Sequence, residues 1–331
     1  MKEVSHMVRL SDISKGESRE LDRVLEAKGL DGDLARAIIR NGMIAKIMVD
    51  AGRAYLGAEA RKAETFENEQ VASTYAYPSG WKMKSVREQA TILAAKFPSL
   101  DVSHVDEIVA RFYTAPSVVD ATEGDYHTAP KSNGTKIVLP KNMDGLAVIL
   151  KPSAAARKNN QELPDWPVYN LAMNELLNVV AASDKKFVDY TERNVGPKRL
   201  RLTQKTEEVY AKLEALMPGD VMIVPVQTGL LHRGKSVQRA RVTFEEQEFG
   251  LCAFAVGCIL LTHPERLKHV DHLWIDCAGS EFAPDSGEVF TCFPCWGFNG
   301  SKLGFRWSRV SFFSPDCGSA SGVSPECPLA P

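Results

Sequence analysis

One eight-residue segment of this chain fits the pattern of a phosphate-binding loop. The fixed positions of GxxxxGK[ST] are occupied by Gly229, Gly234, Lys235 and Ser236. In such loops, backbone amides at a helix N-terminus hold phosphate oxygens, the lysine adds a positive charge, and the serine hydroxyl binds magnesium. Asp276 ends a later apolar run and could help to anchor the metal ion. The pattern therefore predicts a site for ATP or GTP with Mg²⁺.

Two features of the same segment favour a plain surface turn instead. Bulky side chains inside the loop would compete with close approach of the backbone to phosphate; they belong to Leu230, Leu231, His232 and Arg233. Little of the chain remains after the segment to build the sheet of a nucleotide-binding domain. The sequence thus leaves two alternatives, a working phosphate loop or a turn that carries a solvated lysine.

The charge pattern gives a weaker signal for nucleic-acid binding. Segments 193–205 and 233–241 are rich in Lys and Arg and contain no acidic residue, so both could contact a phosphate backbone. Neither segment has an aromatic side chain for base stacking. In the whole chain, 40 Lys and Arg residues face 42 Asp and Glu residues, which leaves a net charge of −2 and excludes a broad basic field. Solvated surfaces of the fold explain these segments better.

The cysteines offer half of a zinc site. Cys292 and Cys295 have the CxxC spacing of two ligands, whereas a structural zinc ion needs four. The chain has no second CxxC, and its other cysteines and histidines do not lie at ligand spacing. We therefore expect no bound metal, and we expect both thiols to pack as inert side chains among aromatic residues.

Other catalytic patterns are absent from the chain. It contains no HExxH, GxSxG or GxGxxG, and segment 318–322 has alanine where a nucleophilic serine would be needed. The leading interpretation is a non-enzymatic intracellular protein that binds a ligand or a protein partner and needs no cofactor. Nucleotide binding through residues 229–236 is the second hypothesis, and nucleic-acid binding is the third.

The N-terminus and the apolar runs predict a cytoplasmic protein that does not interact with membranes. The first residues lack the apolar core of a signal peptide. The longest apolar run, Phe249–Leu261, has 13 residues, whereas a membrane span needs about 20. The chain has 7 cysteines, an odd number, and no export signal accompanies them. Reduced thiols in the cytosol explain this pattern best.

Hydrophobic periodicity predicts an α+β fold, with a helical N-terminal portion and a smaller mixed α/β C-terminal portion. Apolar stripes at helical spacing fill residues 1–115, and a capping box formed by Ser85 and Glu88 marks one helix start. Irregular sequence with a hairpin over 136–151 and two helices, at 168–180 and 202–217, occupy residues 116–218. A strand–helix–strand–hairpin domain, with its hairpin turn at Asn299–Gly300, is predicted for 219–316, and a flexible Gly/Ser/Pro-rich tail for 317–331.

Four stretches of the C-terminal third carry a resemblance to a known family. They read HRGKSVQRAR, EFGLCAFAVGCILLTHPERL, HLWIDCAG and CGSASG. They resemble an uncharacterised protein family predicted from genomes of small uncultured candidate-phylum bacteria. The resemblance spans residues 85–325 and is strongest after residue 220. Because that family has no known activity, the resemblance implies a cytosolic bacterial protein and assigns no site residue.

Overall fold

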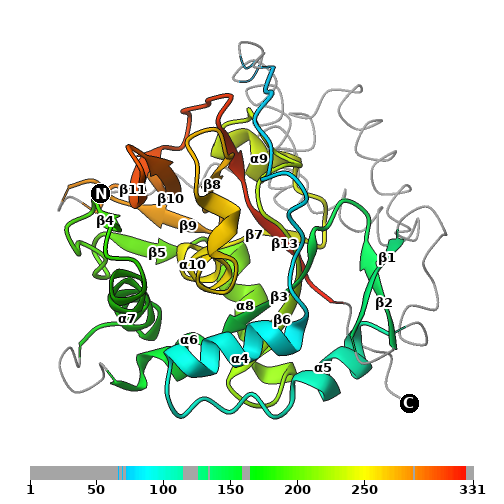
Figure 1. Cartoon of the computed structure of the whole chain (residues 1–331). Coiled ribbons are helices and arrows are strands. Elements are labelled where there is room, and N and C mark those ends of the chain that lie inside the picture. The colour runs from blue at the N-terminus through cyan, green and yellow to red at the C-terminus, as the bar shows by residue number, and fades with distance from the viewer. Residues whose placement is uncertain are drawn as a thin grey trace, which may run out of the picture. The chain divides into compact units, whose positions relative to one another are not determined.

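The structure is a computed structural model that describes residues 72–114, 126–132, 135–158, 165–285 and 288–325, together with Phe66 and Glu69 (Figure 1). The chain divides into two units, Met1–Asn68 and Glu69–Pro331, and each helix and strand with described bounds belongs to the second. Much of the predicted helical segment 1–115 lies outside the described residues, as do residues 326–331 of the predicted tail.

One sheet of this unit has four strands that pair antiparallel throughout, in the order β3–β6–β13–β7. Every residue of β3 and β6 is buried, which places this pair inside the fold. The four strands are β3 (Gly145–Leu150), β6 (Val221–Gln227), β13 (Ser321–Val323) and β7 (Glu248–Gly250).

A second, mixed sheet has seven strands, with a main path of β12–β8–β10–β11–β4. Strand β9 pairs with β10, and β5 pairs with β9. Only β12 and β4 run parallel to their neighbours. The strands are β4 (Val188–Asp189), β5 (Leu200–Leu202), β8 (Trp274–Asp276), β9 (Ser280–Phe282), β10 (Cys292–Asn299), β11 (Lys302–Arg309) and β12 (Cys317–Ser319). A separate hairpin joins β1 (Tyr126–Ser132) to β2 (Thr135–Pro140).

A single buried residue, Ala320, connects the two sheets. It lies between β12 of the seven-stranded sheet and β13 of the four-stranded sheet. Its amide donates to the carbonyl of Asp276 at 2.9 Å, and its carbonyl accepts from the amide of Leu251 at 3.0 Å. The chain therefore passes directly from one sheet into the other, with its backbone hydrogen-bonded on both sides.

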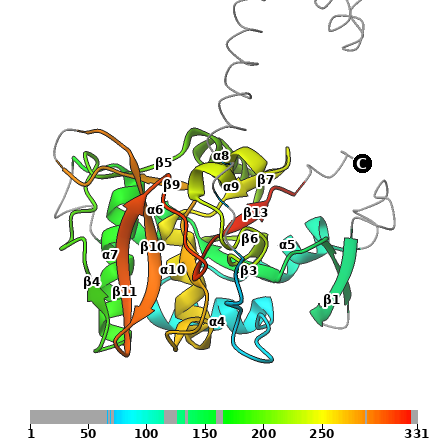
Figure 2. The ribbon, with the colours of Figure 1, turned by 90° about the horizontal axis from the view of Figure 1, so that it is seen from above.

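Helix α10 (Ala253–Thr262) lies at the centre of the fold. The sequence is apolar on all sides of this helix, and all ten of its residues are buried. Figure 2 shows α10 between the β10–β11 hairpin and strands β3 and β6. Gly257 lets α7 (Val168–Ser183) pack closely, since a Cβ at this position would lie 2.3 Å from Cδ2 of Leu176.

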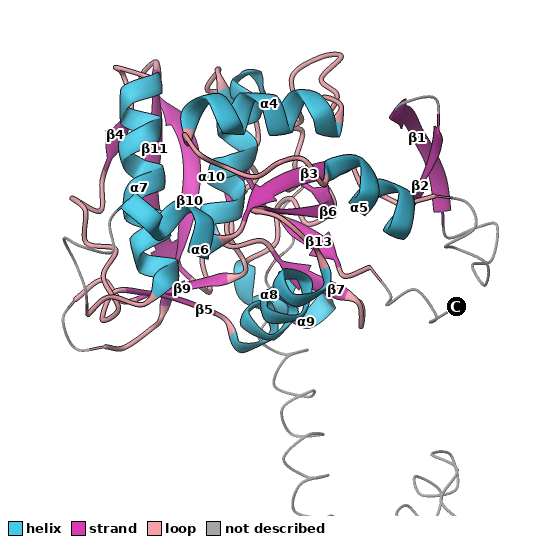
Figure 3. Cartoon of the chain, turned by 90° about the horizontal axis from the view of Figure 1, so that it is seen from below, coloured by secondary structure: helices cyan, strands magenta, loops and turns pink. Residues whose placement is uncertain are grey.

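Other helices cover the two sheets. Helix α4 begins after the predicted capping box, in which Ser85 and Glu88 each bond the other's backbone amide. Figures 2 and 3 place α4 and the pair α8 and α9 at opposite ends of the unit. No helix in the described part of the chain is long and apolar enough to span a membrane. The remaining helices are α4 (Val86–Lys96), α5 (Val105–Phe112), α6 (Pro152–Ala155), η3 (Ala156–Lys158), α8 (Gln204–Leu216), α9 (Val237–Thr243) and η4 (Pro264–Leu267).

The α+β class is confirmed, but the predicted separation into a helical and a mixed portion is wrong. Helices and strands alternate along the chain. Strand β3 pairs with β6 from the predicted C-terminal domain, and α4 packs on β3 and α10, so the two predicted portions share one core. The hairpin predicted over residues 136–151 also does not form. Strand β3 finds a better partner in the equally apolar β6, and β2 pairs with β1.

The predicted hairpin after β10 is confirmed, with Trp296 opposite Phe305. Its turn lies one residue later than predicted, because the two residues between the strands are Gly300 and Ser301, and both have positive φ. The predicted flexible tail is wrong for residues 317–323, which form β12 and β13. Small residues there permit close packing, since a Cβ on Gly318 would lie 2.1 Å from the carbonyl oxygen of Gly229.

Where β7 meets residues 278–279, the two backbones approach too closely for a side chain. A Cβ on Gly250 would lie 2.5 Å from the carbonyl carbon of Ala278. We expect Gly250→Ala to lower the free energy of unfolding by about 3 kcal/mol, because neither backbone can move aside easily. Gly300→Ala is the control. It has open space around it and should cost only about 1 kcal/mol for its left-handed backbone. Urea denaturation measures both, and equal losses would contradict this account.

Candidate functional site

The segment that matches the phosphate-loop pattern joins β6 to α9. Phosphate loops follow a strand of a parallel sheet, whereas β6 is antiparallel to both β3 and β13. Ser236 is the N-cap of α9, and its hydroxyl accepts from the amide of Arg239 at 3.0 Å. Its own amide donates to Oε2 of Glu69 at 3.0 Å. A carboxylate of the chain therefore occupies the helix start where a phosphate would bind.

Other amides of the loop are also paired within the chain, and they end on acceptors in different elements. Gly229 and Leu231 donate to Oε1 of Gln227 at 2.8 and 3.3 Å. Leu230 donates to the Tyr77 hydroxyl at 3.2 Å, and Gly234 donates to the carbonyl of Cys317 at 2.9 Å. These amides do not converge on one point, so the segment has the residue pattern of a phosphate loop without its geometry.

Gln227, at the end of β6, holds the start of this loop against both sheets. Its Nε2 donates to the carbonyl of Ser319 at 2.8 Å and to the hydroxyl of Ser321 at 2.7 Å. The side chain is fully buried and uses both ends of its amide. Sequence reasoning missed Gln227, although a polar residue at the end of an apolar strand was a usable signal.

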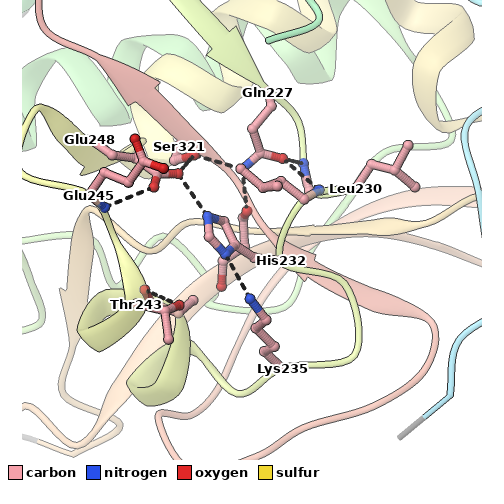
Figure 4. A network of polar contacts seen from close by, with 12 residues as sticks. Gln227, Leu230, His232, Lys235, Thr243, Glu245, Glu248 and Ser321 are labelled. Atoms are coloured by element: carbon pink, nitrogen blue, oxygen red, sulfur yellow. Dashed lines mark hydrogen bonds and ion pairs between the residues drawn. The ribbon is translucent and has the colours of Figure 1, made fainter. Parts of the chain in front are cut away.

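A buried histidine inside the loop forms the centre of a polar network (Figure 4). Nε2 of His232 lies 2.7 Å from Oε1 of Glu248, and Nδ1 lies 3.4 Å from Nζ of Lys235. Glu248 also accepts hydrogen bonds from the Ser321 hydroxyl and from the amide of Glu245. The sequence pattern placed Lys235 and His232 close together, but Glu248 and Ser321 join them only through the fold.

The charge state of Glu248 determines which histidine nitrogen carries the proton. Burial raises the pKa of Glu248, but hydrogen bonds from His232 and Ser321 outweigh burial and hold that pKa below its ordinary value. The carboxylate is therefore ionised at neutral pH and can only accept. Nε2 of His232 must then carry the proton, which leaves the lone pair of Nδ1 facing Lys235.

Exposure within the loop divides its bulky residues into two kinds. Leu230 and Leu231 are each 38% exposed, while His232 is buried. Figure 4 shows the Leu230 side chain pointing away from the polar network. The leucines thus face solvent and do not line a ligand hollow, as expected for a surface turn.

A second buried network anchors the residue before the loop, Thr228. Arg266 is completely buried and donates to the hydroxyl and carbonyl of Thr228 at 3.0 and 2.8 Å. Asp144 accepts from the amide of Thr228 at 2.7 Å and from the hydroxyl of Tyr77 at 2.8 Å. The guanidinium of Arg266 stacks 4.2 Å from the centre of the Tyr77 ring. This network fixes the residue that precedes the loop.

Asp276 lies in β8, away from the phosphate-loop residues it was predicted to assist. No hydrogen bond or ion pair joins it to Ser236 in the described structure. Its direct neighbours are Cys295 on β10 and Ser319 on β12. Burial, with a smaller contribution from Asp316, raises the pKa of Asp276 to about 8. The carboxyl is therefore protonated at neutral pH, which makes it a poor ligand for magnesium.

The CxxC cysteines cannot bind one metal ion together. Cys292 and Cys295 lie three positions apart on β10, and side chains at that spacing on a strand point to opposite faces. Among the described residues, no group of three His, Cys, Asp or Glu side chains could hold a metal ion. Burial raises the pKa of both thiols, so neither is a ready nucleophile.

Five of the nine cationic side chains in the two basic segments form ion pairs, and the other four make hydrogen bonds to carbonyl groups or to a histidine. Each Lys and Arg side chain of 193–205 and 233–241 makes an ion pair or a hydrogen bond within the chain. The partners are Asp189 for Arg193, Glu288 for Lys198, Ala283 for Arg199, Glu281 for Arg201 and Arg241, Glu245 for Lys205, Tyr75 for Arg233, His232 for Lys235 and Glu69 for Arg239.

A pocket of about 170 Å³ opens where α4, α7 and α10 end beside the tip of the β10–β11 hairpin. Its walls are mostly apolar, and two lysines and one aspartate lie among the lining residues. The ammonium of Lys96 donates to the Ser183 hydroxyl at 2.8 Å. The sequence could not indicate this pocket because its walls come from six separate elements, α4, α7, α10, η4, β10 and β11. The lining residues are Lys96, Val180, Ser183, Asp184, Leu260, Leu261, Pro264, Leu267, Lys268, Phe298 and Leu303.

Comparisons of the chain with protein-family models, with curated proteins and with solved structures find no match.

Measurements of the free energy of unfolding test the role of Ser236 as N-cap of α9. We expect Ser236→Ala to lower the free energy of unfolding by about 1 kcal/mol, because the amide of Arg239 loses its acceptor. Ser324→Ala is the control, since its hydroxyl has no hydrogen bond to the described residues, and it should change stability by less than about 0.5 kcal/mol. Urea denaturation distinguishes the two, and an unchanged midpoint for Ser236→Ala would refute the capping role.

The buried Asp276 should make stability fall as pH rises. An unfolded aspartate loses its proton near pH 4, while Asp276 in the fold keeps it up to about pH 8. Between these values the unfolded state binds fewer protons, so Asp276 should cost about 1.4 kcal/mol per pH unit.

The measurement is the difference in unfolding free energy between Asp276→Asn and the parent chain. We expect this difference to grow in favour of the variant from pH 5 to pH 7.5, within the window set by the two pKa values. Asp165→Asn, at an exposed position, is the control and should show a constant difference. Parallel stability curves for Asp276→Asn and the parent would show that Asp276 is ionised in the fold.

Proposed function

We propose that this chain is a non-enzymatic intracellular binding protein, and that its ligand is a small apolar carboxylate held in the pocket between α4, α7, α10 and the β10–β11 hairpin. The observation that supports this proposal is the pocket itself, which combines apolar walls with two lysine ammonium groups. Ligand sites in proteins commonly show this combination of mostly apolar lining and a few polar groups.

The volume and the apolar walls of the pocket suit a ligand that contains a single ring. An apolar cavity of about 150 Å³ is large enough to bind benzene, and this pocket measures about 170 Å³. Leu260, Leu261 and Phe298 belong to elements that pack on the main core, so these walls are held in place. A rigid apolar wall lowers the cost of ordering the site when a ligand binds.

The charges around the pocket favour an anionic end on the ligand. Lys96 and Lys268 carry two positive charges against one negative charge on Asp184. Lys96 can donate three hydrogen bonds and uses one on Ser183. The ammonium of Lys268 has no hydrogen-bond partner among the described residues, and this residue is exposed. A carboxylate between the two ammonium groups would balance the charge.

The chemistry of the neighbouring groups supports binding rather than turnover. The pocket lining contains no cysteine or histidine, and its only carboxylate is that of Asp184. The six cysteines in the described part of the chain are free and buried, which suits a reducing intracellular setting. Burial raises the pKa of Cys277, Cys295 and Cys317, so these thiols stay protonated at neutral pH.

Titration calorimetry with benzoate tests the proposal, with benzyl alcohol as its neutral counterpart. We expect benzoate to bind with a Kd of about 1 mM or tighter, and benzyl alcohol to bind more weakly. Lys96→Met should weaken benzoate binding about fivefold, in line with a partly exposed charge pair. The same change should leave benzyl alcohol binding unaltered, and Lys96→Arg should restore most of the benzoate affinity.

Lys212→Met is the matched control, because Lys212 is an exposed lysine of α8, at the opposite end of the unit from α4 (Figure 3). It should leave benzoate binding unchanged. Two outcomes would contradict the proposal. One is the absence of saturable benzoate binding up to about 10 mM. The other is equal binding of both compounds with no effect of Lys96→Met, which would show an apolar pocket without selectivity for anions.

A further inference from the structure

Three side chains of the loop network lie in the order of a nucleophile, a base and a carboxylate that orients the base. Nζ of Lys235 lies 3.4 Å from Nδ1 of His232, and Nε2 of His232 lies 2.7 Å from Oε1 of Glu248 (Figure 4). Since the proton of His232 sits on Nε2, its Nδ1 lone pair faces the lysine amine. This order is the one that activates weak nucleophiles in proteins.

From this geometry we infer that Lys235 is a nucleophilic amine that accepts an acyl group from an acyl phosphate, with His232 as its general base. The site is separate from the apolar pocket and does not depend on what the pocket binds. Its product is a chain that carries an acyl-lysine at residue 235.

The surroundings of the three side chains fit this role. Lys235 is half-buried, so a small reagent can reach its amine, whereas the side chains of His232 and Glu248 are only 4% and 5% exposed. The ring of Phe244 packs edge-on against His232, with 5.1 Å between ring centres, and holds its orientation. The base is therefore fixed and sheltered while the nucleophile remains accessible.

The charged groups near Lys235 favour its neutral amine. Burial lowers the pKa of Lys235, and the positive charge of Arg239 lowers it further, while the negative charge of Glu248 opposes both. The pKa nevertheless lies below its ordinary value. Arg239 also places a positive charge near the amine, where it can attract the phosphate of an acyl phosphate.

The reaction balances without a further co-reactant. The neutral amine of Lys235 attacks the acyl carbon, a C–N bond forms, and the C–O bond to phosphate breaks. The proton lost by the amine passes to Nδ1 of His232. His232 then returns that proton to the departing phosphate, and the imidazole is neutral again. Glu248 stabilises the imidazolium between these two transfers.

Acetylation by acetyl phosphate, followed by peptide mass spectrometry on the full chain, tests the inference. The exposed Lys212 of α8 serves as an internal reference in every sample. We expect Lys235 to react about tenfold or more faster than Lys212, which is modest for general-base assistance. His232→Gln and Glu248→Gln should each reduce the ratio of the two rates toward one.

His269→Gln is the matched control, because His269 is exposed and distant in sequence from the relay, and it should leave the ratio unchanged. His232 is buried, so its variant could fail to fold, and circular dichroism checks this. The pH profile of the parent chain then gives an independent test. The acetylation rate of Lys235 should level off at a lower pH than that of Lys212, and equal rates with the same profile would overturn the inference.

Discussion

The fold depends on one constraint, the close packing of a helix that has no polar face. Every residue of α10 is buried, so the helix must be surrounded by protein on all sides. The two sheets and helices α4 and α7 provide this enclosure, and Gly257 lets Leu176 pack directly on the helix backbone. Burial of each large side chain contributes about 2 kcal/mol, which makes this helix a main source of stability.

The enclosure of α10 brings the two sheets so close that the chain crosses between them at Ala320. The serines on either side of Ala320 anchor the start of the loop, because Gln227 donates hydrogen bonds to the carbonyl of Ser319 and to the hydroxyl of Ser321. With Arg266 and Glu69 holding its two ends, the loop is fixed along its length. The contact between Lys235 and His232 is therefore a property of the whole fold.

Local features of the fold were predictable where neighbouring residues determine them. The capping box at Ser85 and the β10–β11 hairpin depend on short-range contacts, and both form. The pairing of β3 with β6 was not predictable, because their apolar sequences fit several partners equally well. The Gly- and Ser-rich residues 317–323 suggested flexibility, although small side chains also permit close backbone packing, as at Gly318.

The sequence by itself determined the α+β class, the start of α4 after Ser85 and the buried character of the apolar run 249–261. Tertiary structure decided everything that needs partners distant in the chain. It placed Glu69 at the start of α9, turned the loop amides toward separate acceptors, and brought Glu248 to His232. The physical reason is that a sequence pattern specifies which groups are present, whereas the direction of an amide and the pKa of a carboxyl depend on what packs around them.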